Sequence, residues 1–348
     1  MSETQPWKFF ALQRLNFQFL KLNFQFLEGN FKMSEPCALK QILRPSATHW
    51  ALRRAGKSHS INQNWHIEPK ELSNIEIRYP QKKYIWYGAR ICLDLLLFEF
   101  KYRVPVRFID LPQSYQGIVW FQLVKNGRVH DITVDYSDYP QVNTEAVAHS
   151  TVYFKMQYAS EGYEFGNVIP GGYVTDSLRL YLHIRRMQQL RDQKKFEFDV
   201  YGRFGVDFAT DIRERAIGIL NTQNCFRFEG GLKKVRFAAF LREVARSKIV
   251  IDLPGNGAFC HRLVNYLALG ACVVAYPHDS VMHVPLENHK HLVYCQKDFS
   301  DLVETCEYYL THADEREAIC SQSRSYFEAN LHHANLANYY LRKCLDAV

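Results

Sequence analysis

The chain has 348 residues, of which 47% are hydrophobic and 23% are charged, and its formal net charge is +7. These proportions are typical of globular proteins and exclude a collagen-like, coiled-coil or wholly disordered chain. The most apolar stretch, residues 91–100, is shorter than the roughly 20 residues of a bilayer-spanning helix and contains Asp94 and Glu99. We therefore expect no polytopic membrane protein, and the length predicts about two domains.

Positive charge is concentrated near the N-terminus. Residues 1–57 contain nine Lys or Arg and three Asp or Glu, so the rest of the chain is close to neutral and no nucleic-acid-binding surface is expected there. Residues 15–27 repeat "LNFQFL" with a period of seven. We assign residues 1–33 as a basic amphipathic leader, in which residues 7–32 either contact a membrane surface or form a poorly ordered terminus.

The nine cysteines include no C-x-x-C pair, and several lie in apolar runs, as Cys272 does in "GACVVAY". This pattern favours free, buried thiols in a reducing compartment over a disulfide framework or a zinc knuckle. The N-terminal residues lack the uninterrupted apolar run of a signal peptide. We therefore expect a cytoplasmic protein, associated with a membrane if the leader binds lipid.

The first half of the chain predicts part of an α/β domain. Residues 34–80 show no clear periodicity, and Gly and Pro residues mark 166–174 as a linker. Between these segments the apolar spacing predicts the following order: a helix at 89–103, a strand at 104–111, two strands at 117–124 and 129–138 around an Asn-Gly turn, and a helix end leading into a strand at 146–158.

The second half alternates regularly between strands and helices. Such alternation requires a parallel sheet with helices on both faces. After a basic amphipathic helix at 177–195, we predict strands at 196–204, 225–231, 248–254 and 270–277, and helices at 210–221, 234–247, 260–269, 299–311, 314–329 and 334–346.

Residues 247–277 contain the most informative motif, a strand followed by a Gly-rich turn and a helix. Amide groups at a helix start, together with the helix dipole, form a site for phosphate. Gly255 and Gly257, on either side of Asn256, would let the backbone approach an anion, and Arg262 in the first helical turn would pair with phosphate oxygens. No Gly-Lys-Ser/Thr follows, so the motif is not a Walker loop.

The helix "HRLVNYLALG" followed by "ACVVAYP" resembles the C-terminal nucleotide-sugar domain of GT-B glycosyltransferases. Arg262 and the preceding "DLPGNG" look most like the family of protein O-glucosyltransferases and capsule xylosyltransferases. The resemblance covers roughly residues 196–346. It implies an α/β, GT-B-like fold in which two Rossmann-like domains face a cleft: an N-terminal acceptor-side domain at 34–172 and a C-terminal nucleotide-sugar-binding domain at 173–348.

The resemblance also implies the reaction, which is hexosyl or pentosyl transfer from a nucleotide sugar, most consistent with a UDP-sugar, with no further cofactor. The acceptor would be a hydroxyl group of a glycan, a lipid or a protein. Retaining enzymes of the GT-B group carry a Glu where this sequence has Asn265. That difference favours an inverting mechanism.

Donor-binding residues are predicted at the carboxyl ends of the strands, where ligands of open α/β sheets bind. Arg203 follows the first strand of the second domain, and His261 precedes Arg262. Both are expected to join Gly255, Asn256 and Gly257 around the phosphates, while Tyr276 lines the base or the ribose. The alternative for Arg203 is a surface salt bridge, and for His261 an ordinary helix-start position.

Inverting transfer needs a general base that takes the proton of the acceptor hydroxyl. Asp135, Asp138 and Asp110 each lie at the end of a predicted strand of the first domain. We favour Asp135, with Asp138 second and Asp110 third, because Tyr136 and Tyr139 nearby could stack on a sugar. The alternative is that these aspartates cap turns.

Two further functions stay open from the sequence. A non-catalytic relative of the same fold would bind a nucleotide or a partner protein without transferring sugar. A Rossmann-type methyltransferase would use the glycine turn of "YGRFGVDF" and Asp207, although the later "GACVV" strand does not suit it. The histidines between residues 278 and 291 fit no compact tetrahedral site, so we predict no metal.

Overall fold

The computed structural model describes residues 47–57, 61–81, 87–205 and 207–348. The leader assigned to residues 1–33, for which a membrane contact through 7–32 was one of two expectations, lies outside the described residues. Pro45–Val348 form one compact unit, and both sheets described below belong to it. None of the described helices is long and apolar enough to cross a membrane.

The first half of the chain forms a six-stranded sheet of order β2-β1-β3-β4-β5-β7. The neighbouring strands are parallel except where β3 pairs with β1 and β4. The strands are β1 (Ile75–Pro80), β2 (Val106–Ile109), β3 (Ile118–Lys125), β4 (Arg128–Asp135), β5 (Val152–Lys155) and β7 (Val168–Pro170).

The predicted hairpin is confirmed. Asn126 and Gly127 both have positive φ, 51° and 80°, which a two-residue turn between twisted strands requires. The turn sets the register in which Lys125 pairs with Arg128 and Ile118 with Asp135. Strand β1 was not predicted. Its buried Ile75, Ile77 and Tyr79 alternate over only six residues, which is too short to distinguish from irregular sequence.

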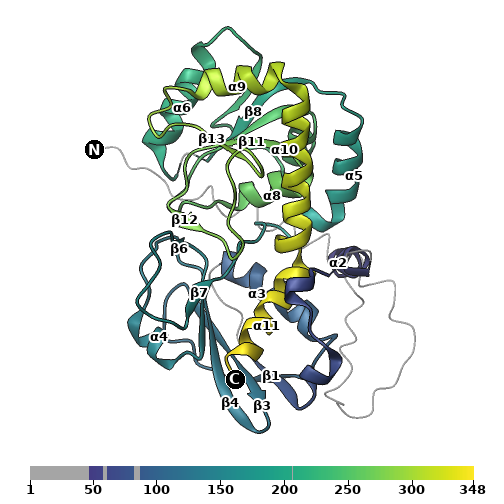
Figure 1. Cartoon of the computed structure of the whole chain (residues 1–348), viewed down its shortest axis with the longest axis vertical. Helices are drawn as coiled ribbons and strands as arrows, with labels where there is room; N and C mark the ends of the chain where they lie inside the picture. Colours follow the sequence, from purple (N-terminus) through teal and green to yellow (C-terminus); the bar gives the residue numbers. More distant parts are fainter. Residues whose placement is uncertain (1–46, 58–60, 82–86, 206) are drawn as a thin grey trace, which may run out of the picture. The chain divides into compact units, whose positions relative to one another are not determined.

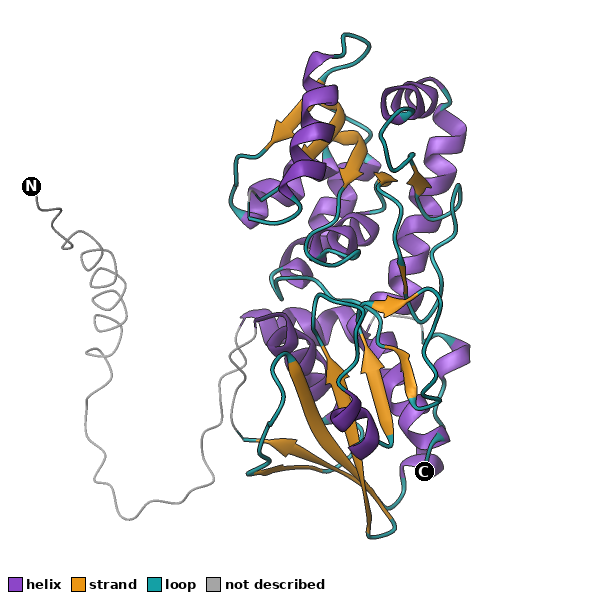
Figure 2. Ribbon diagram, turned by 90° about the vertical axis from the view of Figure 1, so that its left-hand side faces the viewer, coloured by secondary structure: helices purple, strands orange, loops and turns teal. Residues whose placement is uncertain are grey.

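Helices cover both faces of the first sheet (Figure 2). The long helix α3 (Tyr87–Phe100) contacts α11 (His333–Asp346), and both contribute to the largest hydrophobic core. Helix α4 (Thr144–His149) packs in a separate small core with Tyr153 and Val168. The remaining elements of this part are α2 (Ala47–Lys57), η1 (Gln63–Trp65) and η2 (Pro69–Leu72).

The second half forms a five-stranded, fully parallel sheet of order β13-β11-β10-β8-β9. Its strands are β8 (Phe198–Arg203), β9 (Phe228–Gly231), β10 (Ser247–Asp252), β11 (Cys272–Ala275) and β13 (Val293–Tyr294). Side chains from three helices pack in the largest hydrophobic core, to which the first sheet also contributes: α5 (Leu180–Asp192), α7 (Phe237–Ala245) and α8 (His261–Leu269). Those of α6 (Thr210–Thr222) and α9 (Leu302–Thr311) pack in a second core.

The predicted linker at 166–174 is only partly a linker. Val168–Pro170 form strand β7, which pairs with β5 at the edge of the first sheet. The chain leaves that sheet after Pro170 and reaches α5 ten residues later. Composition alone did not reveal the strand, because glycines lie on both sides of it and its last residue is a proline.

The end of the chain returns to the first sheet. Helix α10 (Ala313–Tyr326) continues through a π-helical turn, η3 (Phe327–Leu331), into α11 (yellow in Figure 1). The ring of Tyr340 on α11 stacks on Phe154 of β5 with a centroid distance of 3.9 Å. The Lys125 ammonium, at the end of β3, donates to the Val348 carbonyl.

Two further contacts join the halves. Strand β6 (Tyr158–Ala159) pairs antiparallel with β12 (Ser280–Val281). The buried Gln157 amide donates to the Phe259 carbonyl and accepts from the Phe259 N–H. The α/β, GT-B-like fold class is therefore confirmed, with a first sheet that is mixed rather than wholly parallel.

Candidate functional site

A pocket of about 270 Å³ opens at the carboxyl ends of β8 and β10. In the sheet, β9 lies on one side of β8, whereas β10, the next strand along the chain, lies on the other side of β8. The strand order therefore reverses here, and open parallel sheets bind ligands at such a switch point. The lining combines basic, aromatic and polar side chains: Asp176, Arg203, Phe204, Gly205, Lys234, Val235, Phe237, Phe240, Arg262 and Asn265.

Arg262 is held in place by the end of β10. Its Nε donates to Oδ1 of Asp252 at 3.1 Å, and its Nη2 donates to the Leu253 carbonyl at 2.6 Å. The guanidinium lies 4.6 Å from the Phe204 ring centroid. Burial lowers the pKa of Arg262, but Asp252, Tyr266 and Cys260 together outweigh burial, and the pKa is raised. Among the described residues Nη1 has no hydrogen-bond partner, which leaves it available to a ligand.

Arg203 is less available than the sequence suggested. Its Nε donates to Glu243 and its Nη2 to Glu229, both at 2.8 Å. Burial lowers the pKa of Arg203, the Glu243 carboxylate raises it, and the net shift is upward. Arg203 thus lines the pocket and also forms the salt bridges that were its alternative role.

Arg213 was not predicted. It is buried in the first turn of α6. Its Nε donates a hydrogen bond to the Pro254 carbonyl, and its Nη1 donates one to the Gly205 carbonyl. It therefore ties the loop after β8 to the loop after β10. Burial and, secondly, the charge of Arg262 lower its pKa. The signal in the sequence was a basic residue in the first turn of a predicted helix, where the helix dipole favours acidic residues.

The Gly-rich turn after β10 makes different contacts from those predicted. The Gly255 N–H donates to the Gly257 carbonyl, so it is not open to a phosphate. A Cβ atom on Gly257 would lie 2.4 Å from Nε2 of Gln157 and 2.6 Å from the Asp138 carbonyl oxygen. The glycine thus permits close packing against the first half of the chain. Asn256 donates to Asp138 at 3.4 Å.

His261 and Tyr276 do not line the pocket. Nδ1 of His261 lies 2.7 Å from the Val174 carbonyl oxygen, and its ring packs on Tyr173. The Tyr276 N–H donates to the Asp252 carbonyl, and its ring packs on Phe299. These contacts account for both residues by local structure, and a donor-binding role for either stays a prediction.

The three aspartates proposed as the base differ in exposure. Asp135 is 1% exposed. Its carboxylate accepts from Lys155 at 2.9 Å, from the Tyr153 hydroxyl at 2.6 Å and from the Ser137 N–H at 2.8 Å. The order of preference therefore needs correction, because an acceptor hydroxyl cannot reach a carboxylate enclosed by three donors.

Asp138 is only partly buried, and it lies against the loop that follows β10. Asp110 is exposed and follows β2, which is separated from β4 by two strands. Tyr139 is 59% exposed and could stack on a sugar, whereas Tyr136 is buried and could not. Asp138 is thus more accessible than Asp135, and the identity of a catalytic base stays a prediction.

A second group was missed at the carboxyl end of β10. Asp252 is buried, and its Oδ2 has no hydrogen-bond partner in the described part of the chain. Nε2 of His278 lies 3.9 Å from that oxygen, and Nδ1 of His278 lies 3.1 Å from the Tyr294 hydroxyl. An aspartate that ends the apolar run "KIVID" was the available signal. The described residues contain no group of three or more His, Cys, Asp or Glu side chains arranged to hold a metal ion.

Residues 184–342 match a family described as glycosyl transferase-like. The match covers slightly less than half of the chain and contains nearly all of the pocket lining. It supports sugar transfer as the general reaction. The protein O-glucosyltransferase and capsule xylosyltransferase resemblance is not confirmed by it.

No curated protein matches the chain. Among solved structures, a glycosyltransferase from Rickettsia africae ESF-5 is similar at 14% sequence identity and a TM-score of 0.29. The similarity covers 50% of this chain and 46% of the Rickettsia chain.

Proposed function

We propose that the protein transfers a sugar from a nucleotide-sugar donor to a hydroxyl group of an acceptor. The observation that carries this proposal is the pocket at the switch point of the second sheet. Its lining contains three basic side chains and three phenylalanine rings, and it lies almost entirely in the segment that matches the glycosyl transferase-like family. Basic groups suit a diphosphate, and aromatic rings suit a base.

Within the pocket the donor's diphosphate would lie between Arg262 and Lys234, with Arg203 at its side. Nη1 of Arg262 is free of protein partners in the described chain, and Lys234 is exposed with only a surface contact to Asp207. Phe237 and Phe240 are half-buried and would contact the base, for which uracil is our proposal. The diphosphate therefore depends more on Arg262 and Lys234 than on the Gly-rich turn.

For the chemical step we propose inversion, with Asp138 as the general base. Asp138 belongs to the first half and contacts Asn256 of the second, so its carboxylate lies where an acceptor could approach both halves. It would take the proton of the acceptor hydroxyl as the oxygen attacks the anomeric carbon and the nucleoside diphosphate leaves. The acceptor would be a glycan, a lipid or a protein.

Ligand-induced thermal stabilisation would test donor binding. UDP, GDP, ADP and their sugar conjugates would be titrated into the full chain, because a ligand that binds only the native state raises the melting temperature. We expect UDP and UDP-sugars to stabilise the wild type and Lys234→Ala to lose most of that gain. Arg324→Ala is the matched control, since Arg324 is a surface residue paired with Asp192.

The panel separates the competing functions. Stabilisation by UDP with no transfer to any acceptor would support the non-catalytic alternative. Stabilisation by none of the nucleotides would contradict the nucleotide-sugar proposal.

A cytoplasmic location with membrane contact through residues 7–32 also stays a proposal. Flotation of the full chain with anionic vesicles, compared with a chain lacking residues 1–32, would test the membrane contact.

A further inference from the structure

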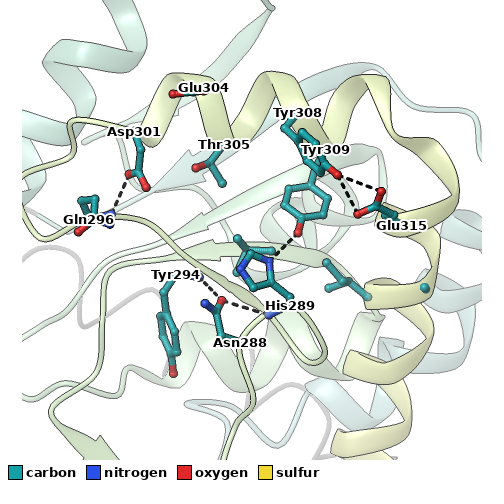
Figure 3. Close-up of a pocket in the computed structure, with 13 residues that line it drawn as sticks. Asn288, His289, Tyr294, Gln296, Asp301, Glu304, Thr305, Tyr308, Tyr309 and Glu315 are labelled. Atoms are coloured by element: carbon teal, nitrogen blue, oxygen red, sulfur yellow. Dashed lines mark hydrogen bonds between the residues drawn. The ribbon is translucent and has the colours of Figure 1, made fainter.

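A second and larger pocket, of about 690 Å³, lies beside the short edge strand β13 (Figure 3). Its walls come from residues 288–296 around that strand and from helices α9 and α10. It shares no lining residue with the donor pocket at β8 and β10. The proposed donor site therefore leaves this pocket without an assigned function.

Four rings contribute to the lining: Tyr294, Tyr308, Tyr309 and His289. Tyr308 is 42% exposed, although one side of its ring stacks on His312 at 3.9 Å. Such rings offer large, flat, apolar surfaces with few rotatable bonds. A ligand with at least one flat apolar face would therefore gain most from this pocket.

The polar lining consists mainly of groups that bind hydroxyls. The carboxylates of Asp301, Glu304 and Glu315 accept hydrogen bonds, and the side-chain amides of Asn288 and Gln296 both donate and accept. No Lys or Arg is present in the described lining. Phosphates and other anions are thus disfavoured, in contrast to the donor pocket with its Arg203, Lys234 and Arg262.

Several of these groups are fixed before any ligand binds. The Tyr309 hydroxyl lies 2.8 Å from Nδ1 of His289, and the Tyr308 hydroxyl donates to Glu315. His289 has a φ of 59°, and the Asn288 carboxamide oxygen accepts from the N–H groups of His289 and Tyr294. Figure 3 shows Tyr308 and Glu315 on one side of the view and Asp301 with Gln296 on the other. Rigid walls reduce the entropy lost on binding.

We propose that this pocket binds a neutral oligosaccharide. A pyranose ring has an apolar face of C–H groups, which fits a tyrosine ring, and a rim of hydroxyls, which fits carboxylates and amides. The absence of basic groups from the described lining favours an uncharged sugar over a phosphorylated one. The proposal does not depend on the proposed transfer reaction, because a chain that transfers no sugar could still bind glycan here.

Titration of the full chain with cellotetraose, maltotetraose and N-acetylchitotetraose, followed by calorimetry and saturation-transfer NMR, would test the proposal. We expect at least one of them to bind. Tyr308→Ala should weaken that binding about tenfold, a typical loss for an aromatic contact residue. Tyr308→Phe, which keeps the ring, should retain most of it. UDP binding should be the same in wild type and in both variants, which shows that the fold is intact.

Three results would overturn the proposal. The first is that none of the three oligosaccharides binds. The second is that one binds with equal affinity to wild type and Tyr308→Ala, which would place the sugar elsewhere. The third is that choline or spermidine binds in a Tyr308-dependent way while the oligosaccharides do not, which would make the pocket a cation site. Absence of UDP binding in the wild type, with oligosaccharide binding that depends on Tyr308, would contradict only the proposed donor site.

Discussion

The Arg262 guanidinium and the Asp252 carboxylate form an ion pair in which Nε lies 3.1 Å from Oδ1 and the carboxylate is completely buried. Arg262 therefore has a structural role in addition to the ligand-binding role proposed for it, and the sequence did not separate the two. Two of its nitrogens hold the end of β10, and the third is directed to no protein acceptor in the described chain. Removing the Arg262 side chain should therefore change the stability of the protein as well as the binding of a ligand.

Arg262→Ala should weaken nucleoside diphosphate binding by about 1.5–3 kcal/mol, the range for a hydrogen bond to a charged group. It should also destabilise the protein by about 3–5 kcal/mol, because the buried Asp252 charge loses its partner. Calorimetric titration and urea unfolding would measure the two effects separately.

The double variant Arg262→Gln with Asp252→Asn is the control for that prediction. It removes both charges, so stability should recover in large part while diphosphate binding stays weak. Normal diphosphate binding in the double variant would show that Arg262 only supports the fold.

Asp138→Asn should lower turnover by about 10²–10⁴-fold, as expected for loss of a general base, and leave donor affinity near wild type. Asp110→Asn should retain activity, because Asp110 follows the edge strand β2. Steady-state transfer from the donor found in the nucleotide panel would measure both. Full activity of Asp138→Asn would exclude it as the base.

Gly257→Ala should destabilise the protein by about 1–3 kcal/mol, because the added methyl group meets the buried Gln157 side chain and the Asp138 backbone. The matched control is Gly218→Ala in α6. Nothing lies within 4 Å of a Cβ there, so the better helix propensity of Ala should stabilise the protein by about 0.5–1 kcal/mol. Equal effects of the two substitutions on urea unfolding would argue against close packing at Gly257.

His283 should make stability depend on pH in the acidic range. Both of its ring nitrogens are buried, its ring stacks on Tyr339 at 4.3 Å, and burial lowers its pKa to about 3. The unfolded chain therefore binds a proton between about pH 6.5 and pH 3 that the folded chain does not. Stability should fall as the pH decreases through that window, by up to about 1.4 kcal/mol per pH unit.

His283→Phe keeps an aromatic ring and removes the titrating group, so its stability should vary less between pH 6.5 and pH 4 than that of the wild type. His66→Gln, at an exposed position, is the control. Parallel pH profiles for wild type and His283→Phe would show that His283 does not titrate as described.

Most regular elements of the second half could be predicted because their signals are local; the two-residue strands β12 and β13 were missed. Apolar spacing of 3.6 or two residues specifies a buried face regardless of what packs on it, and strand–helix alternation leaves a parallel sheet as the outcome. The Asn126–Gly127 turn is local in the same sense, since only such residues tolerate its positive φ values. Weak or short signals failed: β1 and β7 each span few residues and contain a proline.

The roles of individual charged residues could not be predicted from the sequence. Asp135 ends β4, Asp138 lies three residues later, and the two look equivalent in the sequence. Yet Lys155, twenty positions after Asp135, binds the Asp135 carboxylate, whereas Asp138 stays partly exposed. Arg262 meets Asp252, and Asn256 meets Asp138, only because the sheets bring distant loops together. Periodicity records which face of an element is buried. It carries no information about which side chain from another element will lie opposite a given carboxylate, and that pairing decides between a structural charge and one that can act on a substrate.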